Sequence, residues 1–270
     1  MIRFLPKQIT RNKERQTKYR WKTFWWLLIM FVLAAIANIP HSRAVKELTS
    51  QSFDLESQSI LQSIIANAGV ALIMGSIFIW IGLWISVRAN LGAPLIVKIL
   101  SGKSFSDSFN KKTILTSVLI GALVGFLMLL MLKVQEYVFP MGTAKFNHPS
   151  AIPNLFASFS AGITEEIIFR LGIMSLIITA IQSLIKTNIP SNKTIWIGNV
   201  LTALIFGLIH IPMSGNYFDL TPIVIGTTVL GNVITGTTFG WIFWRYGLMM
   251  AMLAHIIFDV VFHVIGTPFG

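Results

Sequence analysis

The chain has 270 residues, of which 54% are apolar and only 11% are charged, against roughly 25% charged in an ordinary soluble domain. A soluble fold of this size could not bury so much apolar surface, so this composition and the mean hydropathy of +0.73 exclude a soluble globular protein. The absence of cysteine excludes disulfides, a zinc–cysteine site and a thiol nucleophile. The net charge of +11 suggests nucleic-acid binding, but the positions of the basic residues argue against it.

The first predicted element is a basic segment, residues 1–22, which carries eight of the 21 lysine and arginine residues. The apolar run Phe24–Leu28, which contains two tryptophans, follows directly. This arrangement is typical of a cytoplasmic juxtamembrane segment beside anionic lipid headgroups. We therefore expect the lipid bilayer, and no nucleic acid, as the partner of this segment. A cleaved signal peptide is disfavoured, because the basic region is long and no small-residue cleavage site follows it.

Seven apolar segments follow in chain order, and a helical crossing requires about 20 residues. They span residues 23–40, 60–87, 113–132, 151–185, 194–211, 220–243 and 247–265. The fourth segment is long enough to be tilted, broken or made of two pieces. The stretch Leu91–Val97 is too short to cross and is expected at the membrane interface. The sequence therefore predicts an all-α, polytopic transmembrane helix bundle with about seven crossings.

The distribution of basic residues predicts the orientation of the bundle. With the N-terminus in the cytoplasm, 16 basic residues fall in cytoplasmic loops and 4 in outer loops, while Arg170 lies within a segment. Cytoplasmic loops are enriched in lysine and arginine, so we predict a multi-pass protein of the cell membrane with its N-terminus inside and its C-terminus outside. Beyond residues 1–22, the cytoplasmic set is Arg88, Lys98, Lys103, Lys111, Lys112, Lys186, Lys193 and Arg245, and the outer set is Arg43, Lys46, Lys133 and Lys145.

Three of the apolar segments contain ionisable residues, each of which costs about 2.5–3.5 kcal/mol on insertion scales and is a candidate functional residue. They are Glu165, Glu166, Arg170, His210, His255 and Asp259. Any one of them is as consistent with a structural ion pair or an ion path as with catalysis. The whole set, on three helices within the last 110 residues, favours a functional site. We assign no role to His41, His148 and His263.

The spacing of these residues indicates how they are arranged. Glu166 and Arg170 are four residues apart, so they share a helix face and can pair. Glu165 points about 100° away from Glu166 and is expected to face a different partner. Repulsion between adjacent carboxylates in a poorly solvated site disfavours ionisation of both, which suits a general base. His255 and Asp259 are also four residues apart on one helix.

Several common catalytic motifs are absent. The sequence contains no H-E-x-x-H zinc motif, no G-x-S-x-G nucleophile elbow and no Gly-x-Gly-Asp protease motif. Gly102-Lys103-Ser104 looks like half of a P-loop, but Val97 stands where the first glycine would be.

The motifs that are present occur in a characteristic order. E-E-x-x-x-R, F-x-x-x-H and H-x-x-x-(N/D), each on a hydrophobic helix, resemble the CPBP family of CAAX prenyl proteases and bacteriocin-processing enzymes, also called Abi proteins. The resemblance covers about residues 150–265. The stretch Leu91–Pro94 also looks like the segment that precedes the core in bacterial members of this family. We therefore divide the chain into the basic segment 1–22, N-terminal transmembrane helices 23–145 and a catalytic core 146–270.

The resemblance implies an intramembrane glutamate protease that uses no cofactor and no metal. Carried onto this chain, Glu165 and His210 would activate a water molecule, and Glu166 with Arg170 would orient the site. His255 and residue 259 would stabilise the tetrahedral oxyanion. The family more often has asparagine at that last position, and an ionised Asp259 cannot donate a hydrogen bond. Asp259 is therefore expected either to be protonated or to orient His255, unless the site is impaired.

Two alternatives to this interpretation stay open at the level of the sequence. A zinc-dependent membrane metallopeptidase is one, because glutamate, histidine and aspartate are suitable zinc ligands. A non-catalytic scaffold, bacteriocin-immunity protein or transporter is the other. The expected substrate is a membrane-embedded or membrane-presented peptide, and its identity does not follow from the sequence.

Overall fold

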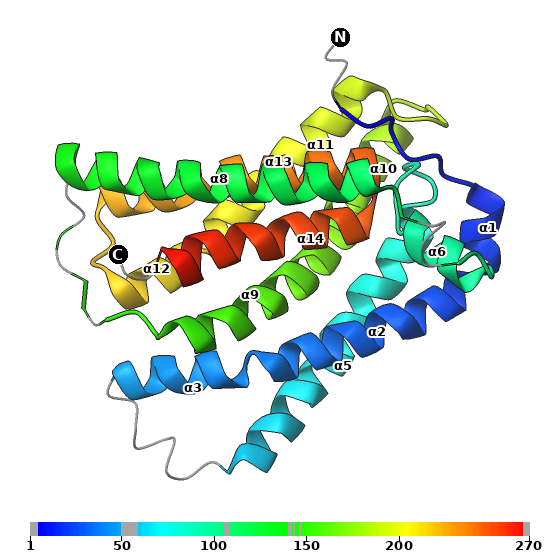
Figure 1. Cartoon of the computed structure of the whole chain (residues 1–270). Helices are drawn as coiled ribbons and strands as arrows, with labels where there is room; N and C mark the ends of the chain where they lie inside the picture. The colour runs from blue at the N-terminus through cyan, green and yellow to red at the C-terminus, as the bar shows by residue number, and fades with distance from the viewer. Residues whose placement is uncertain are drawn as a thin grey trace.

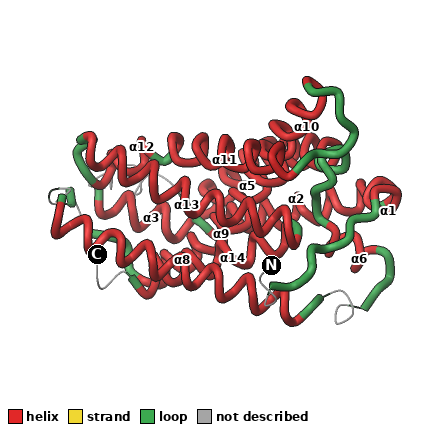
Figure 2. The backbone as a smooth tube through the Cα atoms, turned by 90° about the horizontal axis from the view of Figure 1, so that it is seen from above, coloured by secondary structure: helices red, strands yellow, loops and turns green. Residues whose placement is uncertain are grey.

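The structure is a computed structural model that describes residues 5–49, 59–104, 109–139, 142, 144, 145 and 147–266. These residues form helices and loops, with no β-strand among them. Figure 1 shows the long helices stacked side by side, and Figure 2 shows the same bundle from above. Seven helical units are long and apolar enough to cross a membrane, which confirms the predicted all-α multi-pass bundle.

The seven units follow the predicted segments closely. They are α2 with α3 (Arg20–Ala37 and Ile39–Leu48), α5 (Ile60–Ile85), α8 (Lys111–Val138), α9 with η1 and α10 (Ala151–Glu165, Glu166–Met174 and Ser175–Leu184), α11 with α12 (Asn192–Ile209 and Ile211–Tyr217), α13 (Pro222–Tyr246), and α14 with η2 (Leu248–Asp259 and Val260–Ile265). Two short helices, α1 (Lys13–Lys18) and α6 (Pro94–Leu100), lie together at one end of the bundle (Figure 1).

Polar residues at the helix starts explain where the long helices begin. Ser59 and Gln62 form a reciprocal capping box at the start of α5, and Asn110 caps α8 with its side chain. Ser191 caps α11 and Thr221 caps α13 in the same way. Each cap satisfies a backbone N–H that has no partner within its own helix.

The helix α9 lies in the middle of the bundle and packs against α2, α3 and α14 (Figure 1). Its continuation η1 packs on α5, while α14 packs on α8, and α11 pairs with α13. Residues from both halves of the chain share one hydrophobic core, for example Leu27 and Ile79 with Leu171, Phe243 and Ala254. The N-terminal helices therefore support the C-terminal ones directly.

The fourth apolar segment is one continuous helical unit of 34 residues and is not broken into two. Its middle part, η1, is a π-helix, which has wider turns than an α-helix. A second π-helix, η2, follows α14. Such segments are rare and are frequently found at functional sites. The hydrophobic pattern of the sequence predicts neither of the two π-helices.

The short apolar stretch Leu91–Val97 is not among the seven candidate crossings, as predicted, and it is buried within the protein. Leu91 and Ile96 are almost fully buried. The helix α6 contacts α1, α2 and α14, and the backbone N–H of Leu248 donates to the carbonyl of Gly92 at 3.3 Å. This stretch therefore closes one end of the bundle at the turn between α13 and α14.

Residues 5–12 form an extended strap across the same end of the bundle. The N–H of Ile9 donates to the carbonyl of Arg245 at 2.9 Å, and the guanidinium of Arg11 donates to the carbonyls of Trp244 at 2.6 Å and Phe243 at 3.0 Å. Burial, and secondly the charge of Arg245, lower the pKa of Arg11 to about 10, which leaves it charged at neutral pH. Part of the basic segment thus caps the last carbonyls of α13.

Two pairs of glycines spaced four residues apart, Gly121 with Gly125 and Gly236 with Gly240, mark close helix packing. A Cβ at Gly121 would meet the carbonyl oxygen of Ala254 in α14, and a Cβ at Gly125 would lie 2.8 Å from Val261. A Cβ at Gly236 would lie 3.1 Å from Ala203 of α11, and one at Gly240 would meet Asn199. The first pair therefore lets α8 approach α14, the helix that carries His255 and Asp259.

Candidate active site

A buried ion pair forms the base of the candidate site. Arg170 Nε donates to Glu166 Oε2 at 3.2 Å, and both side chains are 0% exposed. The two residues are four apart within η1, so the pairing predicted from their spacing is present. Each charge neutralises the other, without which neither would be tolerated at this depth.

Glu166 also holds the histidine of α14. The Nδ1–H of His255 donates to Glu166 Oε1 at 3.0 Å, across 89 residues of sequence. Glu166 therefore connects Arg170 on its own helix with His255 on a neighbouring helix. Because the carboxylate fixes Nδ1 as the donor, Nε2 is the atom that faces the remaining acidic residues.

Two further carboxyl groups lie beside His255 Nε2. Asp259 Oδ2 is 3.6 Å from it and Glu165 Oε2 is 3.8 Å from it. The Glu165 side chain is 26% exposed, whereas that of Asp259 is 7% exposed. Arg170 pairs with Glu166, and Glu165 faces a different partner, as expected. That partner is His255, so the two glutamates converge on the two nitrogens of one imidazole. Glu165 is also the most accessible carboxyl group of the site.

Aromatic rings enclose this cluster. Phe239 of α13 stacks on His255 with ring centroids 4.5 Å apart and an interplanar angle of 20°. Phe206 of α11 lies edge-on to His255 at 6.4 Å, and the guanidinium carbon of Arg170 is 5.4 Å from the Phe206 ring centroid. Phe169 packs edge-on against Phe206 at 4.9 Å. A low-dielectric wall of this kind strengthens the electrostatic interactions within the site.

His210 does not join the cluster directly. It lies at the end of α11, and its Nδ1–H donates to the backbone carbonyl of Phe206 at 2.7 Å. Its ring centroid is 4.4 Å from that of Phe206, which therefore contacts both histidines. Among the described residues, His210 has no hydrogen bond or ion pair with Glu165 or His255. The backbone bond leaves Nε2 as the free nitrogen of His210.

The helix distortions fall directly at the acidic residues. The π-helix η1 begins at Glu166, and the π-helix η2 begins one residue after Asp259. A close approach between the two helices supports this register, because a Cβ at Gly162 would meet the side chain of Ile256. The carboxyl groups are thus presented from two helices that are locally widened and tightly packed.

Among the described residues, the acidic and histidine side chains do not form a metal centre of the usual kind. Within the described ranges, no three histidine, aspartate or glutamate residues are grouped so that they could hold a metal ion. The contacts of His255 are those of a hydrogen-bonded and ion-paired imidazole, with its Nδ1 committed to Glu166.

The sequence interpretation missed two contributors to the site. Phe239, which stacks on His255, lies in a helix without acidic residues or histidine, and nothing in its local pattern separates it from an ordinary core phenylalanine. The supporting strap around Arg11 was also missed, because a basic residue near the N-terminus is indistinguishable from a lipid-facing one. Phe206 was present in the F-x-x-x-H motif, although its contact with Arg170 could not be foreseen.

The fold and the site together define a multi-pass helical membrane protein with a buried Glu–His–Arg centre. Residues 147–261 match the family model of the type II CAAX prenyl endopeptidase Rce1-like proteins. No curated protein and no solved structure matches the chain. The match confirms the resemblance to the CPBP family over these residues. All six candidate residues lie within the matched range.

Proposed function

We propose that this protein is an intramembrane endopeptidase that hydrolyses a membrane-embedded or membrane-presented peptide bond with a water activated by Glu165. The family match supports a membrane peptidase in general. The observation that carries the mechanism is the placement of His255 between Glu166 at Nδ1 and the pair Glu165 and Asp259 at Nε2.

In the proposed reaction Glu165 takes a proton from water, and the hydroxide attacks the carbonyl carbon of the peptide. The carbonyl oxygen becomes an oxyanion, which a proton on His255 Nε2, together with the carboxyl group of Asp259, stabilises. Glu165 then gives its proton to the leaving amine as the C–N bond breaks, which regenerates the carboxylate. His210 supports the water from the side of its free Nε2. Glu166 and Arg170 are positioning residues that hold His255.

The choice of Glu165 as the base rests on its accessibility and on its partners. Glu166 is 0% exposed and its oxygens already accept hydrogen bonds from Arg170 and His255, so it is poorly placed to meet a water molecule. Glu165 has no hydrogen bond within the described residues and is the carboxyl group of the cluster with the largest exposed fraction. A general base must be within hydrogen-bond reach of its water, which favours the exposed group.

The test compares cells that carry the wild-type protein, Glu165→Gln or Glu136→Gln. Glu136 is a matched control, because it is an exposed glutamate on α8 whose one ion pair within the described residues is with Lys133. Mass spectrometry of membrane peptides should show products with the wild type and Glu136→Gln that disappear with Glu165→Gln. On purified protein and an identified substrate, we expect the rate to fall ~10²–10⁴-fold.

The same assay separates the proposal from its alternatives. An intact peptide pattern in Glu165→Gln would contradict the peptidase and favour a scaffold, immunity protein or transporter. Activity that is lost in a strong chelator and restored by added zinc would instead favour a metallopeptidase. We expect activity to persist in the chelator.

A further inference from the structure

A basic cavity lies at the end of the bundle where α1 and α6 meet, away from the acidic cluster. It has a volume of about 360 Å³ and is lined by Asn12, Glu14, Arg15, Lys18, Tyr19, Ser101 and Lys103. One wall comes from α1, within the basic N-terminal segment, and the other from the turn that follows α6. Gly102 adopts a φ of +85° in that turn, a conformation that favours glycine, and the turn brings Lys103 to the cavity.

The charges of this cavity favour an anionic ligand. Arg15, Lys18 and Lys103 line it, against the single carboxylate of Glu14. Arginine and lysine, with nearby hydroxyl and amide groups, are the usual partners of phosphate oxygens. Gly102-Lys103-Ser104 is not a P-loop, but Lys103 nevertheless lines a cavity whose charges suit a phosphate group.

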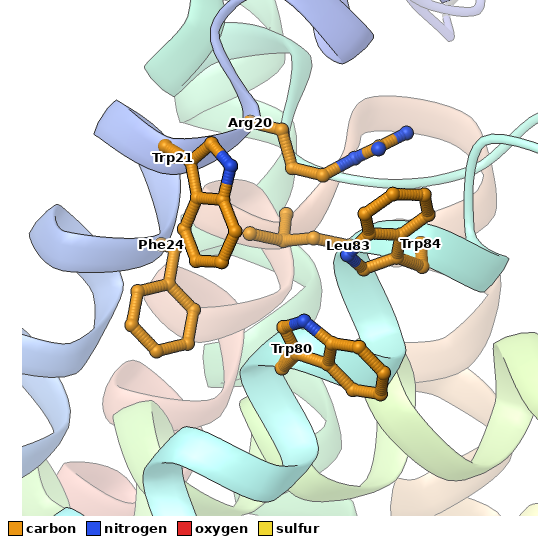
Figure 3. Close-up of a pocket in the computed structure, with 6 residues that line it drawn as sticks. All are labelled: Arg20, Trp21, Phe24, Trp80, Leu83 and Trp84. Carbon is orange, nitrogen blue, oxygen red and sulfur yellow. The ribbon is translucent and has the colours of Figure 1, made fainter.

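The position of the cavity along the bundle identifies the kind of phosphate. Directly after Lys18 and Tyr19, α2 begins with exposed tryptophans at positions 21 and 25, and α5 carries exposed tryptophans at positions 80 and 84. Figure 3 shows Arg20 reaching toward Trp84 beside Trp21 and Trp80, and its guanidinium carbon lies 3.7 Å from the Trp84 ring. Tryptophan concentrates at the headgroup level of membranes.

We propose that this cavity binds the phosphate of an anionic phospholipid headgroup, through Arg15 and Lys18 on α1 and Lys103 on the turn after α6. The exposed tryptophans of α2 and α5 place the cavity at the depth of the lipid headgroups. At this depth lipid phosphates are present, whereas nucleic acid is not. The bound lipid would tie α1 to α6 at the end of the bundle that the Arg11 strap also closes. This inference is independent of the proposed peptidase activity.

The test uses short-chain phosphatidylglycerol as the anionic probe and short-chain phosphatidylcholine as the zwitterionic probe. The purified full-length protein in detergent is titrated with each, and native mass spectrometry counts the bound lipid. We compare the wild type with Lys18→Gln/Lys103→Gln, which removes one cation from each wall. The matched control is Lys111→Gln/Lys112→Gln, which removes the same charge from exposed lysines at the start of α8, outside the cavity.

We expect the wild type and the control to bind phosphatidylglycerol in preference to phosphatidylcholine. The cavity variant should bind phosphatidylglycerol on the order of 10-fold more weakly, because each of the two lysines adds to the electrostatic attraction for the anionic headgroup. Glu14→Gln removes the carboxylate of the cavity and should bind phosphatidylglycerol more tightly than the wild type. Unchanged thermal unfolding midpoints in detergent without added lipid establish that the variants are folded.

Three results would overturn the inference. Equal weakening in the cavity variant and in the control would show a diffuse surface charge and no site. Equal binding of the two lipids would show that the phosphate charge is not recognised. Competition by millimolar inorganic phosphate that displaces the lipid from the wild type completely would assign the cavity to free phosphate.

Discussion

Glu166 is the residue on which the geometry of the site depends. One of its oxygens accepts from Arg170 and the other accepts from His255, and all three side chains are almost fully buried. The carboxylate therefore neutralises the buried guanidinium of Arg170 and at the same time fixes the orientation of the His255 ring. Burying three such groups is tolerable only as a set, since each lacks access to bulk water.

Arg170→Ala should fold poorly as well as lose activity. It would leave Glu166 buried without its cation, a change that typically costs about 3–5 kcal/mol. Glu165→Gln, at a partly exposed position without such a partner, should leave stability nearly unchanged. Thermal or denaturant unfolding of both variants in the same detergent measures the difference. A normally stable Arg170→Ala would show that Glu166 does not need this arginine.

Asp259→Asn should retain activity. The structure assigns the orientation of His255 to Glu166, which accepts from Nδ1, while Asp259 lies 3.6 Å from Nε2. Asparagine is nearly isosteric and always carries N–H donors, so it can serve the oxyanion over a pH range that extends upward. Asp259→Ala should be damaging, and His255→Ala more so.

A pH–rate profile of Asp259→Asn on the identified substrate is the measurement. If the variant were folded but nearly inactive at every pH, position 259 would require a carboxylate and not a hydrogen-bond donor. In that case Asp259 would act on His255 as the aspartate of a catalytic triad does.

At the scale of elements, the site depends on how closely α14 is held by its neighbours. The helix α14 packs on α8 through Gly121 and Gly125 and on α9 through Gly162. At Gly121 the contact is with backbone, because a methyl group there would meet the carbonyl oxygen of Ala254. Gly125 and Gly162 lie against the side chains of Val261 and Ile256. The next residue after Ala254 is His255, so the fit between α8 and α14 sets the height of the imidazole.

Gly121→Val should destabilise the protein and lower its activity together. Overpacking of a close contact costs about 1–3 kcal/mol, and the backbone of α14 has no room to yield without moving His255. Gly69→Val is the matched control, because a Cβ at Gly69 of α5 has no atom within 4 Å. Unfolding midpoints and product formation should fall for the first variant and stay near the wild type for the second. Equal effects would show that helix propensity, and not the helix contact, is responsible.

At the scale of the whole molecule, the distribution of basic residues still predicts which end is cytoplasmic. The end formed by the strap, α1 and α6 carries the basic residues of the N-terminal segment with Lys98 and Lys103. Under the positive-inside rule this end faces the cytoplasm. The predicted C-terminal position Gly270 lies outside the described residues.

Single-cysteine variants can test this orientation cleanly, because the chain has no cysteine of its own. Lys103→Cys should be protected from a membrane-impermeant maleimide in intact cells, whereas Gly270→Cys should be labelled. After the membrane is permeabilised both should react. Labelling of both positions in intact cells, or of neither, would overturn the seven-crossing arrangement with opposite termini.

The sequence by itself determined the class of the protein, the seven candidate crossings and the resemblance to the CPBP family. Apolar length, basic loops and residue spacing are local properties, and they placed Glu166 with Arg170 and His255 with Asp259 correctly on shared helices. The spacing of Gly121 with Gly125 and of Gly236 with Gly240 is typical of close helix packing, but it does not say which helices meet.

Only the tertiary structure decided how the helices meet. It brought Glu165 and Glu166 to the two nitrogens of His255, placed His210 one aromatic ring away, and used Arg11 to close the end of α13. The π-helix at Glu166 also has no pattern in the sequence. The physical reason is that contacts between distant helices depend on their relative height and rotation. Those are set by packing over the whole interface, and a local periodicity does not contain them.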